Sequence, residues 1–96
     1  MRVMLKATMD TEKTNELIRS GKMPEVMKEA LDRLQPEAAY FGPVDGQRTA
    51  LLVFDLTDSS ELPPLNEPFF TEMNARVEMT PIMNAEDMRK GLSAMG

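Results

Sequence analysis

The sequence predicts a small α+β domain, and three observations lead to that prediction. Its 96 residues suffice for one domain. Four short stretches rich in apolar and β-branched residues alternate with segments of helical spacing. The stretch 49–56, Thr-Ala-Leu-Leu-Val-Phe-Asp-Leu, is apolar on both sides, because successive side chains of a strand point to opposite faces. Such a strand must be covered on both faces.

The first half of the chain predicts a strand followed by two consecutive helices. Residues 2–8 alternate loosely between the two faces of a strand. Asp10 or Thr11 then caps a helix. Gly21 suits the end of that helix and Pro24 the first turn of a new one. Apolar residues at helical spacing continue the second helix, which is expected to end before Pro36.

The middle of the chain predicts a hairpin. Residues 38–42 form a short strand, and the pair 45–46, Asp-Gly, is a strong hairpin signal before the doubly apolar strand. A turn of helix around 58–60 is then expected to stop at Pro63-Pro64. Asn66 caps a further short helix that ends at residue 73.

The last part of the chain predicts a strand and a terminal helix. The strand covers 76–83, and Pro81 predicts that it lies at a sheet edge or ends near Pro81, because proline lacks a donor for the ladder. Asn84 caps the terminal helix, and two carboxylates occupy its first turn. Met88, Leu92 and Met95 give that helix a narrow apolar stripe.

The order of these elements is strand, helical crossover, strand, strand, helical crossover, strand, with an extra C-terminal helix. This is the ferredoxin-like βαββαβ arrangement with a four-stranded antiparallel sheet. Right-handed crossovers place both helical connections on one face of the sheet. Side-chain parity assigns to that face Val3, Leu5, Ala39, Phe41, Ala50, Leu52, Phe54, Val77 and Met79. The opposite face is mixed and carries Met4, Lys6, Thr8, Tyr40, Thr49, Leu51, Val53, Asp55, Glu78, Thr80 and Ile82.

Composition excludes several classes of function. The net charge of −5 and a pI of about 4.7 have the wrong sign for nucleic acid and for an anionic membrane surface. The absence of cysteine excludes disulfides and thiolate chemistry, and is compatible with the cytoplasm, where we expect the protein. The absence of histidine excludes serine triads, His-ligated haem and His-ligated zinc. We therefore expect no metal site and no cofactor.

The element order and the polarity of the second face resemble the dimeric α/β-barrel superfamily, in which two ferredoxin-like sheets pack face to face around a central cavity. The resemblance spans nearly the whole chain and implies a homodimer of one domain, residues 1–96. Its members include muconolactone isomerase-like proteins, cofactor-free monooxygenases, haem-degrading enzymes and YCII-related proteins. This chain has no His for the haem-binding or YCII-type sites and no Trp for the monooxygenase constellation. It is most similar to the small uncharacterised members.

The second face supplies the candidate site. Lys6 and Glu78 are expected on neighbouring strands, either as an acid–base pair with perturbed pKa values or as a cross-strand ion pair within an interface. Tyr40, the only tyrosine, either orients a ligand or packs as an interfacial aromatic. Arg48 either clamps a carboxylate or is a solvated strand end. Asp55 either meets Lys6 or caps the following turn.

With Leu51 and Val53 as its apolar wall, this set predicts a cavity that binds a small apolar or aromatic molecule. The leading interpretation is a homodimeric small-molecule-binding protein with the cavity between its two sheets. The alternative is a cofactor-independent isomerase or monooxygenase-like enzyme for a small cyclic or aromatic substrate, in which Lys6, Tyr40 and Glu78 are acid, orienting group and base. A non-catalytic subunit of a larger assembly is a third interpretation.

Overall fold

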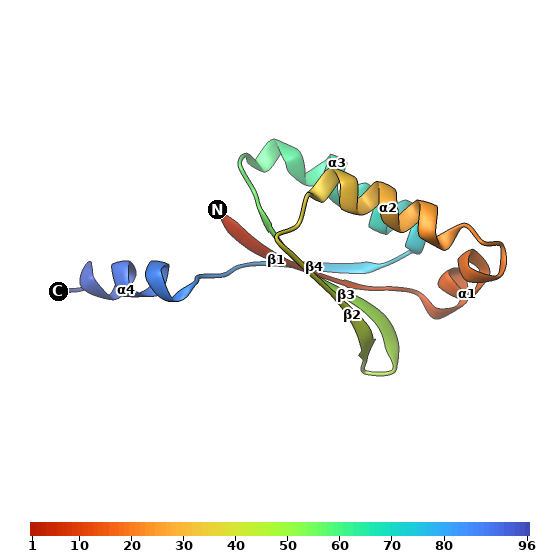
Figure 1. The fold of residues 1–96 in the computed structure, drawn as a ribbon, viewed down its shortest axis with the longest axis horizontal. Helices are drawn as coiled ribbons and strands as arrows, with labels where there is room; N and C mark the ends of the chain where they lie inside the picture. The colour runs from red at the N-terminus through yellow and green to blue at the C-terminus, as the bar shows by residue number, and fades with distance from the viewer.

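The computed structural model describes all 96 residues and shows a four-stranded antiparallel sheet with three helices on one face (Figure 1). A fourth helix projects from one end of the sheet. The strand order is β2-β3-β1-β4, which confirms the α+β, ferredoxin-like prediction. The elements are β1 Arg2–Thr8, α1 Thr11–Arg19, α2 Met23–Leu34, β2 Ala38–Val44, β3 Gln47–Asp55, the 3-10 helix η1 Ser59–Glu61, α3 Leu62–Met73, β4 Arg76–Pro81 and α4 Ala85–Ser93.

The first crossover follows the sequence prediction. Asp10 is the N-cap of α1, and its carboxylate accepts a hydrogen bond of 2.9 Å from the Lys13 backbone N–H. Gly21 has a φ of +75°, which glycine adopts at little cost, and Pro24 lies in the first turn of α2. The chain therefore breaks into two helices where the sequence placed the break.

The second crossover differs from the prediction. Pro63 and Pro64 do not stop a helix; they occupy the first turn of α3, where the backbone N–H groups need no intrahelical partner. Asn66 is therefore inside α3 and not its cap, and its side-chain amide donates to the Leu62 carbonyl at 2.8 Å. Pro68 leaves the Pro64 carbonyl without its helical donor, and the Arg33 guanidinium of α2 donates to that carbonyl at 3.4 Å.

The hairpin and the edge strand confirm the expected turn and edge position, with shifted ends. Asp45 and Gly46 have φ values of +52° and +76°, as a type I′ turn requires. The strands on either side run up to this turn, so β2 and β3 are longer than the sequence predicted. β4 lies at the sheet edge and ends at Pro81.

The core lies between the sheet and helices α1–α3. Its buried apolar residues are Val3, Leu5, Ala7, Met9, Leu17, Ala30, Leu34, Ala50, Leu52, Phe54, Leu65, Phe69, Met73 and Ala75. At its centre Leu5 of β1 is in register with Leu52 of β3 and Met79 of β4. The predicted helix-facing residues of β1 and β3 are all buried, whereas Ala39 and Phe41 on the outer strand β2 are exposed. The helices do not reach far enough across the sheet to cover them.

Leu52→Ala tests this core. The Leu52 side chain is fully buried, so we expect its truncation to lower the free energy of unfolding by about 2–5 kcal/mol. Lys28→Ala is the control, because it removes an exposed i,i+4 ion pair and is expected to change the free energy of unfolding little. Urea unfolding measures both. A loss below about 1 kcal/mol for Leu52→Ala would contradict the packing described.

Glu61 makes stability depend on pH. The Thr57 hydroxyl and the Asp58 backbone N–H donate to its carboxylate, and these hydrogen bonds lower its pKa in the folded protein. Its contribution is therefore present above the unfolded pKa of about 4.3 and is lost as the pH falls through the folded value. We expect Glu61→Gln to be less stable than the wild type at pH 7, and this difference to shrink as the pH falls through the folded pKa. A difference that stays the same at pH 7 and at low pH, by urea unfolding, would refute this assignment.

Candidate functional site

The face of the sheet opposite the helices is uncovered in the protomer, and we call it the open face. None of the four α-helices crosses it (Figure 1). Strand register assigns to it Arg2, Met4, Lys6, Thr8, Ala38, Tyr40, Gly42, Thr49, Leu51, Val53, Asp55, Arg76, Glu78 and Thr80. The candidate residues of the sequence analysis lie here, with one exception described below.

Four candidate residues form one row across the sheet. Tyr40 pairs with Leu51, Leu51 with Lys6, and Lys6 with Glu78, so the row crosses β2, β3, β1 and β4 in turn. Directly opposed residues of an antiparallel pair have Cβ atoms about 4.5–5.5 Å apart. The prediction that Lys6 and Glu78 are same-face neighbours is confirmed, and Tyr40 lies two strands away from Lys6.

The centre of the open face is apolar. Val53 pairs with Met4 and continues the wall beside Leu51. These three side chains are only half-buried, because neighbouring side chains cover them and no helix does. Tyr40, at the rim, is 68% exposed. The face thus combines an apolar centre with a cation from Lys6 and an anion from Glu78.

Lys6 has no ionic partner in the protomer. Its ammonium lies farther than 4.0 Å from every carboxylate oxygen, although its side chain is half-buried. The ionic partner of Glu78 is Arg76 of the same strand, whose Nε lies 3.9 Å from the Glu78 carboxylate. Lys6 and Glu78 therefore form no ion pair within one protomer, and their pairing within an interface stays a prediction.

Arg48 lies on the other side of the sheet, which corrects its assignment to the candidate cavity. It alternates in step with Ala50 of β3, and so it faces the helices. Its Nη1 donates to the Thr14 hydroxyl at 2.8 Å and to the Asn15 side-chain oxygen at 2.9 Å. Arg48 therefore joins β3 to α1 from an exposed position at the start of the strand, and it does not clamp a carboxylate.

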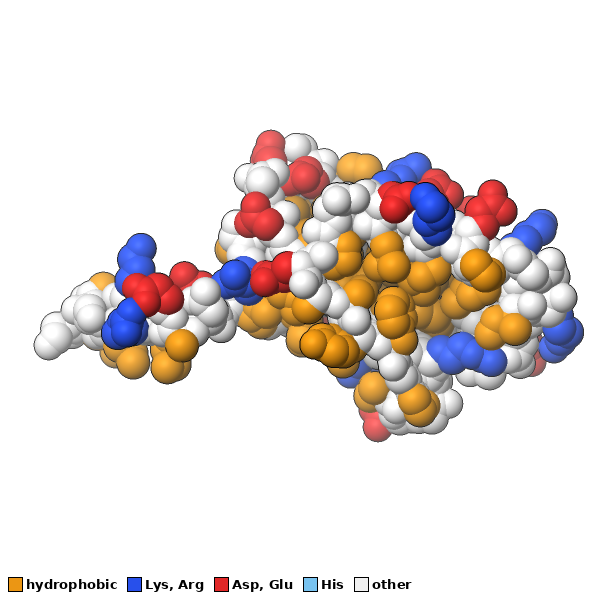
Figure 2. All heavy atoms as spheres, in the orientation of Figure 1, with side chains coloured by type: hydrophobic (Ala, Val, Ile, Leu, Met, Phe, Trp, Pro, Cys, Tyr) orange, Lys and Arg blue, Asp and Glu red, His pale blue; other side chains and the backbone are white.

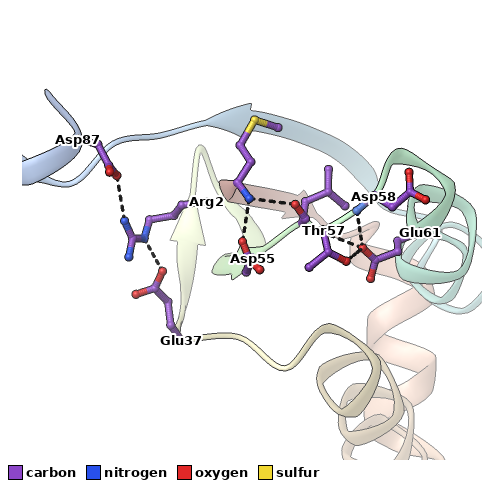
Figure 3. Close-up of polar contacts among 9 residues, drawn as sticks. Arg2, Glu37, Asp55, Thr57, Asp58, Glu61 and Asp87 are labelled. Carbon is purple, nitrogen blue, oxygen red and sulfur yellow. Dashed lines mark hydrogen bonds and ion pairs between the residues drawn. The ribbon is translucent and has the colours of Figure 1, made fainter. Parts of the chain in front are cut away.

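Asp55 neither meets Lys6 nor caps the turn after β3. Its carboxylate accepts a hydrogen bond of 2.8 Å from the Met1 ammonium, and it is in register with Arg2. It lies at the end of the open face, three rows beyond Thr8 and two beyond Lys6. Asp55 thus belongs to a polar cluster at that end, shown in Figure 3.

Arg2 is the centre of this end cluster. Its Nε donates to Glu37 at 2.5 Å and its Nη1 to Asp87 at 3.3 Å, so one guanidinium joins β1, the start of β2 and helix α4 (Figure 3). The hydrogen bond and charge of Glu37 raise the pKa of Arg2. The sequence analysis missed this cluster, because its members are separated by 35 and 85 positions in the chain.

Two hollows lie away from the central row. One, of about 770 Å³, borders the end cluster and is lined in part by Arg2, Asp55 and Ile82. The other is an apolar groove of about 320 Å³ beside the outer strand, lined in part by Met27 and Phe41. Neither contains Lys6 or Glu78, so a chamber over the row requires a second molecule as its other wall.

The structure contains no group of three or more Asp, Glu, His or Cys side chains placed to hold a metal ion. None of its helices has the length and apolarity needed to cross a membrane.

Comparisons with known proteins identify the fold alone. No protein-family model matches the chain, and no curated protein does. An uncharacterised protein from Thermotoga maritima is similar in structure, with a TM-score of 0.52 and 17% sequence identity over 85% of this chain and 95% of that one. The de novo designed protein Ferredog-Diesel has a TM-score of 0.49 and 14% identity over 84% of this chain and 85% of its own. The first of these supports a small α+β fold with this sheet.

Arg2→Gln tests the end cluster. The substitution removes both ion pairs of the guanidinium, so the start of α4 loses its attachment to the sheet. We expect faster hydrogen exchange at the amides of 87–90, with little change in global stability because the pairs are solvent-exposed. Arg33→Gln, which removes a different exposed pair, is the control. Unchanged exchange in α4 would contradict the attachment.

Proposed function

We propose that the protein is a homodimer of the dimeric α/β-barrel type, in which two open faces pack together and enclose a chamber for a small, partly apolar molecule. The observation that carries the proposal is the row of Tyr40, Leu51, Lys6 and Glu78 on an uncovered sheet face. An antiparallel sheet that faces water normally carries polar side chains there. Apolar patches on such a surface mark interaction sites.

The position of Lys6 favours a chamber over a sealed interface. Two packed sheets lie about 10 Å apart, so the centre of each face comes close to that of the other. An ammonium buried there without an acceptor is strongly unfavourable. Glu78, in the next strand, supplies one acceptor for the Lys6 ammonium. Water or an oxygen atom of a ligand supplies its other acceptors. The chamber therefore suits a molecule with an apolar or aromatic body and an acceptor such as a carboxylate.

A cofactor-independent isomerase or monooxygenase-like enzyme is the second candidate, and the direct pairing of Lys6 with Glu78 favours it. A cation and a carboxylate side by side are able to donate and accept protons at one substrate. Such an enzyme requires Tyr40 to converge with them on a pocket open to solvent. In one protomer Leu51 separates Tyr40 from Lys6, so binding is the better supported function.

Leu51→Glu tests the dimer. We expect the wild type to sediment as a dimer at micromolar concentration and the variant as a folded monomer, because the new carboxylate would be buried at the centre of the interface. Ile18→Glu is the matched control: Ile18 is a half-exposed apolar residue on helix α1, away from the open face, and its variant should remain a dimer. A stable wild-type monomer at micromolar concentration would end the proposal.

Lys6→Met tests the chamber, with 8-anilinonaphthalene-1-sulfonate as a probe that has an aromatic body and an anionic group. We expect the wild type to bind this probe and Lys6→Met to bind it at least about tenfold more weakly, because the variant lacks the ammonium that would bind the sulfonate of the probe. Arg48→Met, a cation removed from the other side of the sheet, is the control. Equal affinity for all three proteins, by fluorescence titration, would argue against a site at Lys6.

A further inference from the structure

Helix α4 makes no hydrophobic contact that buries it. Every residue from Met83 to Gly96 is exposed, and the ion pair of Arg2 with Asp87 is the polar link between the helix and the sheet. Figure 1 shows α4 standing clear of the body, in line with the end of the sheet. The chain therefore presents this helix to its surroundings.

A helix of this kind is not stable alone in water. α4 has nine residues, whereas isolated helices shorter than about 12–15 residues are marginal even with favourable sequences. Gly91 in its interior weakens it by about 1 kcal/mol relative to alanine. The capping box of Asn84 and Asp87 starts the helix, but packing against another surface is needed to hold it.

The helix has one apolar side for such packing. Met88 and Leu92, with Met95 in the turn that follows the helix, keep the i, i+4, i+7 spacing and are 49%, 58% and 83% exposed. Glu86 and Lys90 lie on the opposite side of the helix. In Figure 2 the apolar side chains of α4 lie along its lower edge, on the side away from helices α2 and α3. The open face of the sheet is turned to that same side.

The protomer is more extended than a compact monomer of its mass. The radius of gyration is 15.2 Å, against about 12.5 Å for a compact chain of this length. The accessible surface is 6335 Å², against about 5,500 Å² for a compact monomer of 10.8 kDa. The protomer therefore exposes about 800 Å² more surface than a compact monomer of its mass.

We infer that α4 is an arm that packs Met88, Leu92 and Met95 against a second copy of this chain. This rests on the proposed dimer, because a copy that covers the open face approaches α4 from the side that carries its apolar stripe. The alternative, that α4 folds back over its own open face, conflicts with the contacts that the Arg2 guanidinium makes with Glu37 and Asp87. That guanidinium holds Asp87, in the first turn of α4, at the end of the sheet and points the helix outward.

Leu92→Gln tests the arm, with Lys90→Gln as its matched control on the polar side of the same helix. Both replacements are good helix formers, and both sites are exposed in the protomer, so folding should be unchanged. We expect Leu92→Gln to raise the dimer dissociation constant about 10- to 100-fold and Lys90→Gln to change it less than about threefold. Sedimentation equilibrium measures these values, and near-ultraviolet circular dichroism verifies the fold.

The outcomes separate the arm from the face-to-face dimer. A wild-type dimer whose dissociation constant is the same in Leu92→Gln and Lys90→Gln overturns the arm and leaves the dimer. Weakening by Leu92→Gln with no effect of Leu51→Glu supports the arm and removes the packing of the open faces. A wild-type monomer at 100 μM overturns both. In a dimer with one copy labelled at its methionine methyl groups, contacts from Met88 to the unlabelled copy would support the arm directly.

Discussion

Side-chain alternation along β1 and β3 is the constraint on which the rest of the structure depends. One set of alternate residues, with Leu5 and Leu52 at its centre, forms the core under the helices. The other set must then form the opposite face, and in these two strands it includes Met4, Leu51 and Val53. A shift of one residue in register would exchange the two sets. The same pairing therefore fixes both the buried core and the uncovered apolar surface.

The two crossovers determine which of these faces remains uncovered. Right-handed connections bring α1, α2 and α3 to one side, and their combined area covers β1 and β3 but leaves Phe41 on β2 exposed. The opposite side receives no element of the protomer. Its central lysine gives that side a chemical character that a purely apolar interface lacks, because an unpaired ammonium favours water or an anion beside it. The proposed function therefore assigns assembly and ligand binding to one surface.

Much of the fold follows from local signals, and the departures have identifiable causes. Gly21, Asp45 and Gly46 marked their turns because their backbone conformations are decided within a few residues. Pro63-Pro64 misled because proline breaks a helix at an interior position but is favoured in its first turn. Which of the two applies depends on the residues that follow. Arg48 was open to prediction, since it alternates with Ala50. The contacts of Arg2 with Glu37 and Asp87 were not open to prediction, because they join residues up to 85 positions apart.

In the proposed dimer, the arm and the open face depend on one another through the stability of α4. A short helix with an interior glycine gains most of its order when it packs, so part of the energy of association is used to fold it. The ion pair of Arg2 with Asp87 lowers the free energy needed to fold α4, because it holds the first turn in place before a partner binds. Association is then coupled to folding of the last dozen residues. In the proposed dimer, fraying of the arms would accompany dissociation and would open the proposed chamber between the sheets.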